Sequence, residues 1–163
     1  MGLSTDVNTI LYGTRRIARR VGVVGDLVLF APTTVPIFTV TGGDILVHAL
    51  YAKVTTVMDG VATTITLSHT TAISGTVVPI AGAGVVINAA TVDALITITG
   101  AVGVAPTLFD GAARGVGIPN ITNIQILVPG SIGMIVGGAT NAGLLAWTII
   151  YSRLDEESLV TVV

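Results

Sequence analysis

The sequence predicts an all-β fold, an antiparallel sandwich or barrel of short strands. Val, Ile and Thr contribute 24, 18 and 23 residues, so 65 of the 163 residues are β-branched, and such side chains suit a pleated strand better than a helix. Turn-forming pairs such as Asp59-Gly60, Ser74-Gly75 and Pro129-Gly130 recur along the chain and divide it into short segments. No helical pattern of about 10 to 15 residues lies between them, which argues against alternating strands and helices.

The N-terminal segment differs from the rest of the chain in charge. Residues 1–20 contain Asp6 and four arginines, Arg15, Arg16, Arg19 and Arg20, for a net charge of +3, whereas residues 21–163 carry −5. We therefore expect residues 1–25 to form a basic arm, extended or with a short helix at Thr14–Val21, ahead of a β domain at residues 26–163. The arginines could pair with carboxylates of a neighbouring subunit, contact nucleic acid, or solvate a local helix. We favour the first, and expect no nucleic-acid binding because the body is acidic.

The first half of the body predicts a β-hairpin. Ile45–Met58 is a long strand that is largely apolar on both faces, Asp59-Gly60 suits a two-residue turn, and Val61–Thr70 alternates cleanly on the way back. In such a hairpin His48 and His69 would lie about two residues apart. Two histidines without a third ligand make a poor zinc site, so we interpret both as structural and expect no metal.

The second half predicts further strands, separated by turns. In Asn123–Val128 we expect Ile124, Ile126 and Val128 to point inward, and Asn123 and Gln125 outward; Ile132, Met134 and Val136 continue the pattern after Pro129-Gly130. Leu144–Arg153 is a second long strand, in which Leu145, Trp147, Ile149 and Tyr151 share one face. Leu159–Val163 is a terminal strand, and the Gly- and Ala-rich residues 101–120 are a long loop.

The composition indicates a subunit with large interfaces. Only 10% of the residues are charged, which is too few to cover the surface of a small domain. Strands 45–58 and 144–151 are apolar on both faces, whereas a strand with one face in water alternates. A second subunit would supply the missing cover, so we expect a homo-oligomer. No stretch of 18 residues is continuously apolar, and we expect no membrane-spanning helix.

Residues that carry chemistry are scarce in this sequence. There is no Cys, and neither a phosphate-binding loop nor a nucleophile elbow occurs, so we expect no catalytic residues and no cofactor. The acidic run Asp155-Glu156-Glu157 reads as a solvated turn, with a cation site or a partner for the arginine arm as alternatives. We interpret Trp147 and Tyr151 as core or interface residues rather than as a platform for sugar binding.

Two stretches resemble small structural proteins of tailed-bacteriophage virions. The first is Phe38–Val47, with the turn Thr41-Gly42-Gly43-Asp44. The second runs from Pro129-Gly130-Ser131-Ile132 through Thr140-Asn141-Ala142-Gly143 to Arg153-Leu154-Asp155. Together they cover about half of the chain and consist of strand and turn patterns without a chemical signature. The basic arm is not part of the resemblance.

This resemblance implies a fold and a function. Its members are β-sandwich or jelly-roll subunits that decorate or cement a capsid, often as trimers. It implies a non-enzymatic decoration protein on the capsid surface of a virion, with the major capsid protein and its own copies as partners. We expect Arg15, Arg16, Arg19, Arg20, Trp147 and Tyr151 at its interfaces. The alternatives are a tail, connector or head-fibre subunit, and a secreted carbohydrate-binding β-sandwich that uses Trp147 and Tyr151.

Overall fold

The computed structural model describes residues 16–20, 33–58, 62–82, 84–98, 100–101, 103–111, 125–138 and 143–163. These residues form twelve strands: β1 (Arg16–Arg20), β2 (Thr33–Thr41), β3 (Ile45–Thr56), β4 (Thr63–Thr71), β5 (Val77–Pro79), β6 (Val85–Val86), β7 (Leu95–Thr97), β8 (Thr107–Phe109), β9 (Gln125–Leu127), β10 (Gly130–Gly138), β11 (Leu144–Arg153) and β12 (Leu159–Val162). The all-β prediction is confirmed.

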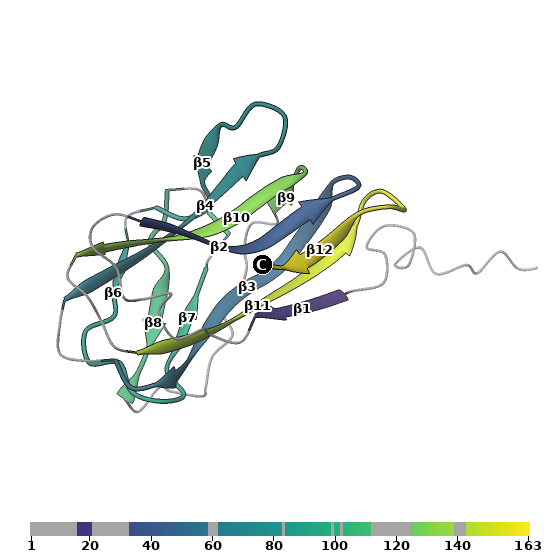
Figure 1. Cartoon of the computed structure of the whole chain (residues 1–163). Coiled ribbons are helices and arrows are strands. Elements are labelled where there is room, and N and C mark those ends of the chain that lie inside the picture. The colour runs from purple at the N-terminus through teal and green to yellow at the C-terminus, as the bar shows by residue number, and fades with distance from the viewer. Residues whose placement is uncertain are drawn as a thin grey trace, which may run out of the picture.

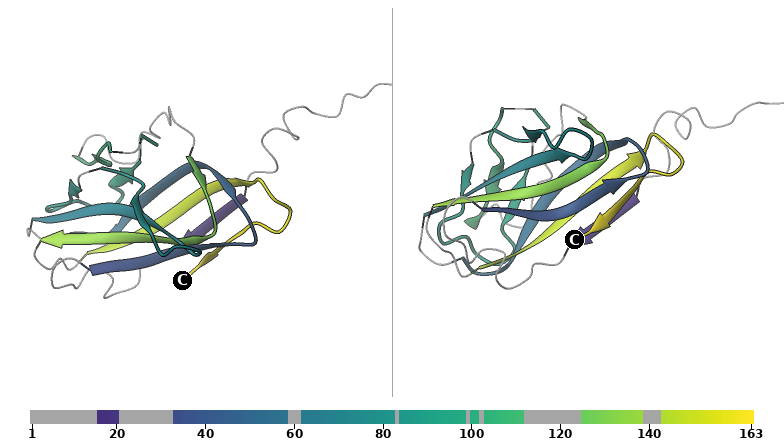
Figure 2. Two further views of the ribbon diagram at one scale, coloured as in Figure 1. Left: turned by 90° about the horizontal axis from the view of Figure 1, so that it is seen from above. Right: turned by 45° about the horizontal axis from the view of Figure 1, so that its top comes forward.

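The strands form two antiparallel sheets that pack face to face (Figures 1 and 2). The first sheet has the order β1-β11-β3-β7-β8, with β9 also paired to β3. The second has the order β12-β2-β10-β4-β5, with β6 also paired to β4. Strands β1 to β4 alternate between the sheets, and the late strands β10 and β11 pair between early ones. This nesting is the strand order of a jelly roll, which confirms the predicted fold type.

The core lies between the two sheets and follows the alternation of the long strands. The face of β11 that carries Leu145, Trp147, Ile149 and Tyr151 is buried, as predicted, and so are Ile132, Met134 and Val136 on β10. These side chains meet apolar residues of β2, β3 and β4, among them Phe38, Ile45 and Leu67. The terminal strand is also confirmed, because β12 pairs with β2 along its whole length.

The predicted hairpin between residues 45–58 and 61–70 is wrong. Strand β3 pairs with β11, β7 and β9 in the first sheet, whereas β4 pairs with β10, β5 and β6 in the second. Each of them is an interior strand: β3 lies between β11 and β7, and β4 lies between β10 and the strand that follows it, β5. The chain therefore crosses between the sheets after β3, and Asp59-Gly60 lies outside the described residues.

A break in register explains part of the two-sided apolarity of β3. Along β11, Ile150 pairs with Ala49 and the next residue, Tyr151, pairs with Val47. His48 is therefore an extra residue on β3. Such a bulge moves the alternation by one position. Ala49 and Leu50 are consequently buried in succession, at 8% and 4% exposure. This stretch needs no second subunit to cover it.

The basic segment is a strand where the structure describes it, in agreement with the extended form expected for it, and the alternative of a short helix is not formed at residues 16–20. β1 pairs with β11 over its five residues, from Arg16 opposite Tyr151 to Arg20 opposite Trp147. Residues 16–20, which the charge pattern assigns to the arm, thus lie in the first sheet. Residues 1–15, including Arg15, are outside the described part of the chain.

Candidate functional site

Three of the four arginines lie on an edge strand. β1 is the outer strand of the first sheet, and it lies beside β12, the outer strand of the second sheet. Arg16 is exposed, and its neighbour Ile17 is 69% exposed. Charge on an edge strand discourages unwanted pairing with another sheet. These three arginines distinguish the strand from the remainder of the chain, which is acidic.

Trp147 and Tyr151 lie in the core, and the structure does not place them on a surface. Each is 2% exposed on the inner face of β11. The Tyr151 hydroxyl accepts a hydrogen bond from the backbone N–H of Val160 at 3.2 Å, and so ties β12 to β11. The expectation that they serve at an interface is corrected to a role in packing. A surface that binds sugars requires exposed aromatic rings. The burial of Trp147 and Tyr151 therefore argues against the carbohydrate-binding alternative.

The two histidines are far from forming a pair, because β3 and β4 belong to different sheets. His48 Nε2 lies 2.7 Å from the Ser152 hydroxyl, across the β3–β11 bulge. His69 lies on the inner face of β4 and is buried, and among the described residues neither of its ring nitrogens has a hydrogen-bond partner. Within the described residues no group of three His, Asp or Glu side chains is placed to hold a metal ion.

The burial of His69 makes the stability of the fold depend on pH. Burial lowers the pKa of His69 below its ordinary value of 6.5, and backbone groups of Ser131 and Val128 near the ring offset this only in part. The unfolded chain therefore binds a proton more readily than the folded one. We predict that the free energy of unfolding is constant above about pH 6.5 and falls as the pH is lowered from there.

Urea unfolding at several values between about pH 7.5 and pH 5.5 tests this prediction. The variant His69→Leu should lose the decrease over this range, because it removes the proton-binding group. His48→Gln should keep it and serves as the matched control. An equal decrease in the wild type and in His69→Leu would contradict the assignment.

The acidic run forms a structured turn against the loop that joins β2 and β3. Asp155 Oδ2 accepts a hydrogen bond from the Asp44 backbone N–H at 2.7 Å, and the Ser158 hydroxyl donates to the Asp44 carbonyl at 2.7 Å. Arg153 donates to the Glu156 carbonyl at 2.8 Å. Asp155 is thus used within the chain, which supports the reading of this run as a turn.

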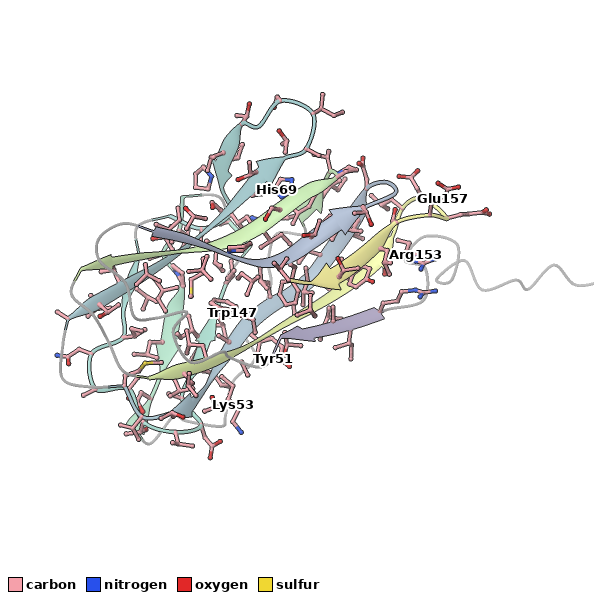
Figure 3. All side chains as sticks on the ribbon, in the orientation of Figure 1. Tyr51, Lys53, His69, Trp147, Arg153 and Glu157 are labelled. Atoms are coloured by element: carbon pink, nitrogen blue, oxygen red, sulfur yellow. The ribbon has the colours of Figure 1, made fainter. Side chains whose placement is uncertain are left out.

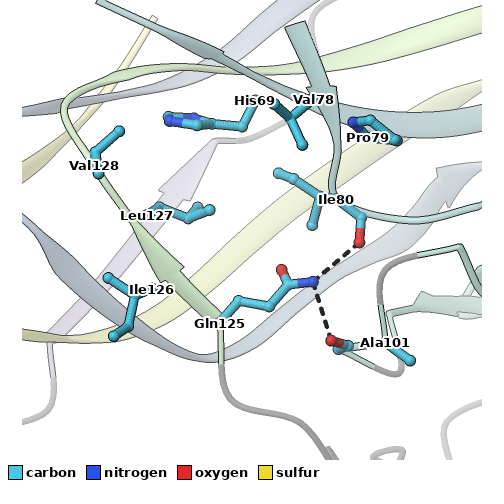
Figure 4. A pocket seen from close by; sticks show the side chains of 10 residues that line it. His69, Val78, Pro79, Ile80, Ala101, Gln125, Ile126, Leu127 and Val128 are labelled. Atoms are coloured by element: carbon cyan, nitrogen blue, oxygen red, sulfur yellow. Dashed lines mark hydrogen bonds between the residues drawn. The ribbon is translucent and has the colours of Figure 1, made fainter.

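An apolar cleft opens at the end of the sandwich where β5 and β9 lie. Its volume is about 640 Å³, and its lining includes Val78, Ile80, Ile126 and Leu127, with His69 beside them (Figure 4). Gln125 Nε2 donates to the carbonyls of Ile80 and Gly100, both at 3.1 Å, and joins β9 to the turn after β5. Among the described lining residues, only His69 can carry a charge.

This cleft corrects the predicted faces of residues 123–128. Ile126 and Val128, expected inside, are 59% and 40% exposed, whereas Leu127 is buried and Gln125 is half-buried. A three-residue strand is too short for alternation to fix its phase, and the two carbonyls give the Gln125 amide a reason to face the protein. The sequence held no signal specific to this cleft, because charge-free runs span both residues 60–92 and residues 115–152.

No protein-family model matches the chain, and no curated protein matches it. One solved structure, that of infectious bursal disease virus Gx strain, has a chain similar in fold to 93% of this one, with 13% sequence identity and a TM-score of 0.31. This protein spans 39% of the length of that viral chain. The likeness is distant, and we base no functional argument on it.

Proposed function

We propose that this chain is a non-enzymatic virion protein that forms a homo-oligomer, expected as a trimer, and binds the outside of the capsid to stabilise it. The observation that carries the proposal is the apolar surface. Fourteen large apolar side chains are exposed among the described residues. One group consists of Val78, Ile126 and Val128, which line the cleft, with Ile73 and Val77 on the adjoining hairpin of β4 and β5; another, Ile17, Leu159, Val162 and Val163, follows the β1 and β12 edges.

Grouped apolar side chains on a surface indicate contact with other proteins. Each contact would remove apolar area from water, at roughly 25 cal/mol per Å², and the symmetry of a shell repeats that gain at every copy. The scarcity of charge and of catalytic motifs in the sequence fits a subunit whose work is association. The resemblance of Phe38–Val47 and of residues 129–155 to small phage virion proteins directs the proposal to a capsid.

A tail, connector or head-fibre subunit is the second candidate of the same class. It is favoured by the same apolar groups, which would serve contacts along a tail equally well. The place of the protein in the particle distinguishes the two. The carbohydrate-binding alternative is disfavoured, since Trp147 and Tyr151 are both buried.

The test of the proposal is co-sedimentation of the purified protein with shells that lack it. We predict that replacing Arg15, Arg16, Arg19 and Arg20 by Ala weakens binding to shells by about tenfold at low salt, and less at high salt, because exposed ion pairs are weak and screened. Removal of residues 1–15 alone is the safe truncation, since β1 begins at Arg16 and pairs with β11.

The control for the arginine variants is Lys53→Ala, which removes a positive charge that pairs with Asp93 elsewhere on the surface. This variant should bind shells as the wild type does. Wild-type occupancy by the four-arginine variant at low salt would exclude an electrostatic role for the segment. A shift of free DNA by the wild type but not by the variant would assign the arginines to nucleic acid instead.

A further inference from the structure

The hairpin of β4 and β5 presents an isoleucine to solvent. It extends beyond the neighbouring strands of its sheet (Figure 1), and Ile73 near its tip is 98% exposed. All residues from Ala72 to Pro79 are exposed, and none of them is charged. Val77 and Val78 on the same hairpin are also exposed, and grouped apolar side chains without charge indicate a site of contact with another molecule.

The tip is held in one conformation by its own hydrogen bonds. The hydroxyls of Thr71 and Ser74 lie 2.6 Å apart, and the Ser74 hydroxyl donates to Thr76 Oγ1 at 2.7 Å. The Gly75 N–H donates to the Thr71 carbonyl at 2.9 Å, which closes the turn. Ile73 is therefore presented on a preorganised turn, and a partner would spend little entropy in ordering it.

The cleft beside this hairpin has the matching chemistry. Val78 and Pro79, at the base of the hairpin, form one wall, and Ile126 to Val128 form the other. The Gln125 amide, bonded to two carbonyls, holds the walls in place (Figure 4). The cleft and the tip are both apolar, and His69, which lines the cleft, lies near the base of the hairpin (Figure 3).

A hairpin tip cannot enter the cleft of its own chain. Val78 lies in the cleft wall and is paired to His69, and Val77 is paired to Thr70, so the hairpin is fixed by the strand pairing next to the cleft. Folding the tip back would break this pairing. Strand addition by another protein is also disfavoured at β5, because Pro79 has no N–H to donate at that edge.

We propose that the tip of this hairpin, with Ile73 at its centre, inserts into the β5–β9 cleft of a second copy of the chain. The inference deepens the proposed function, on which it rests for the assembly of identical subunits, by assigning the surfaces that join them. Each subunit carries one tip and one cleft, so the contact repeats from copy to copy and closes into a ring where the rotation allows it.

Two substitutions at exposed positions separate the two halves of this contact. Ile73→Asp places a charge on the tip and leaves the cleft intact, whereas Ile126→Arg places a charge at the rim of the cleft and leaves the tip intact. Each should weaken self-association by about 100-fold or more in sedimentation equilibrium, because either charge would be buried in the joint. Val57→Asp and Val86→Arg, at exposed apolar positions away from the cleft, are the controls and should assemble as the wild type does.

Mixing the two variants is the decisive arm of the experiment. A mixture of Ile73→Asp and Ile126→Arg retains one intact tip and one intact cleft, and should form a 1:1 dimer although each variant alone is monomeric. Circular dichroism verifies that both are folded, and Ile73→Ser replaces Ile73→Asp if that variant is not. Unchanged assembly of either variant, or a mixture that remains monomeric, would overturn the proposal.

Shell binding separates this inference from the proposed function. A wild type that binds shells but is monomeric at every concentration would overturn the hairpin contact and leave the capsid proposal standing. A wild type that assembles as described but does not bind shells or any other part of the particle would overturn the capsid proposal and leave the hairpin contact standing. Both readouts come from the same preparation.

Discussion

Replacing Trp147 by Ala is expected to lower the free energy of unfolding by about 3 to 5 kcal/mol, a large part of the stability of a domain of this size. Trp147 is among the largest fully buried side chains and lies on the inner face of β11 between the two sheets. Alanine would leave a cavity in the middle of the core, where both sheets are fixed by their strand pairing and cannot close over it.

The matched control is Trp147→Phe, since the indole Nε1 has no hydrogen-bond partner in the described structure. Phenylalanine loses apolar area but removes an unpaired N–H, so we expect a loss of about 1 to 2 kcal/mol. Urea unfolding of the three proteins measures both differences. Equal stability of the Ala variant and the wild type would contradict the placement of Trp147 in the core.

Replacing Gly42 by Ala is expected to cost about 3 kcal/mol, because two effects act at the same residue. The φ angle of Gly42 is +76°, in the left-handed region, and an added Cβ would run into the backbone carbonyl of Glu157. The turn cannot move away easily, since Asp155 and Ser158 both hydrogen-bond to the backbone of Asp44.

The variant Gly75→Ala distinguishes backbone strain from a steric clash of the added Cβ. Gly75 also has a positive φ, +63°, but no atom of the described residues lies within 4 Å of the position of an added Cβ. This variant should lose only about 1 kcal/mol, the ordinary cost of a left-handed alanine. Equal losses for the two variants, by thermal or urea unfolding, would show that the packing of the β2–β3 loop on the turn at Glu157 adds nothing.

The long strands were predictable from the sequence, and their partners were not. The alternation of Ile132, Met134 and Val136 and that of Leu145 to Tyr151 gave the correct buried faces of β10 and β11. Alternation describes one strand at a time, so it could not reveal which strands pair. In the structure β10 lies between β2 and β4, and β11 lies between β1 and β3. The Asp59-Gly60 turn suggested a local hairpin, whereas the chain crosses to the other sheet.

The candidate site was only partly predictable, because segments distant in sequence build it. The arginines of the N-terminal segment stood out by charge, and three of them lie on β1. The cleft joins β5, β9 and residues 100–101, and no periodicity connects these segments. Trp147 and Tyr151 stood out as rare aromatic residues, and the pattern of their strand already placed them on the face that is buried in the core.

The central claim is that the protein binds the outside of a capsid as a structural subunit. Electron cryomicroscopy of shells before and after addition of the purified protein tests it most directly. The account predicts new density on the outer surface, repeated with the symmetry of the shell and of the size of a 16.5 kDa β-sandwich in each subunit. Shells that gain no outer density, with the protein found on tails or free in solution, would contradict it.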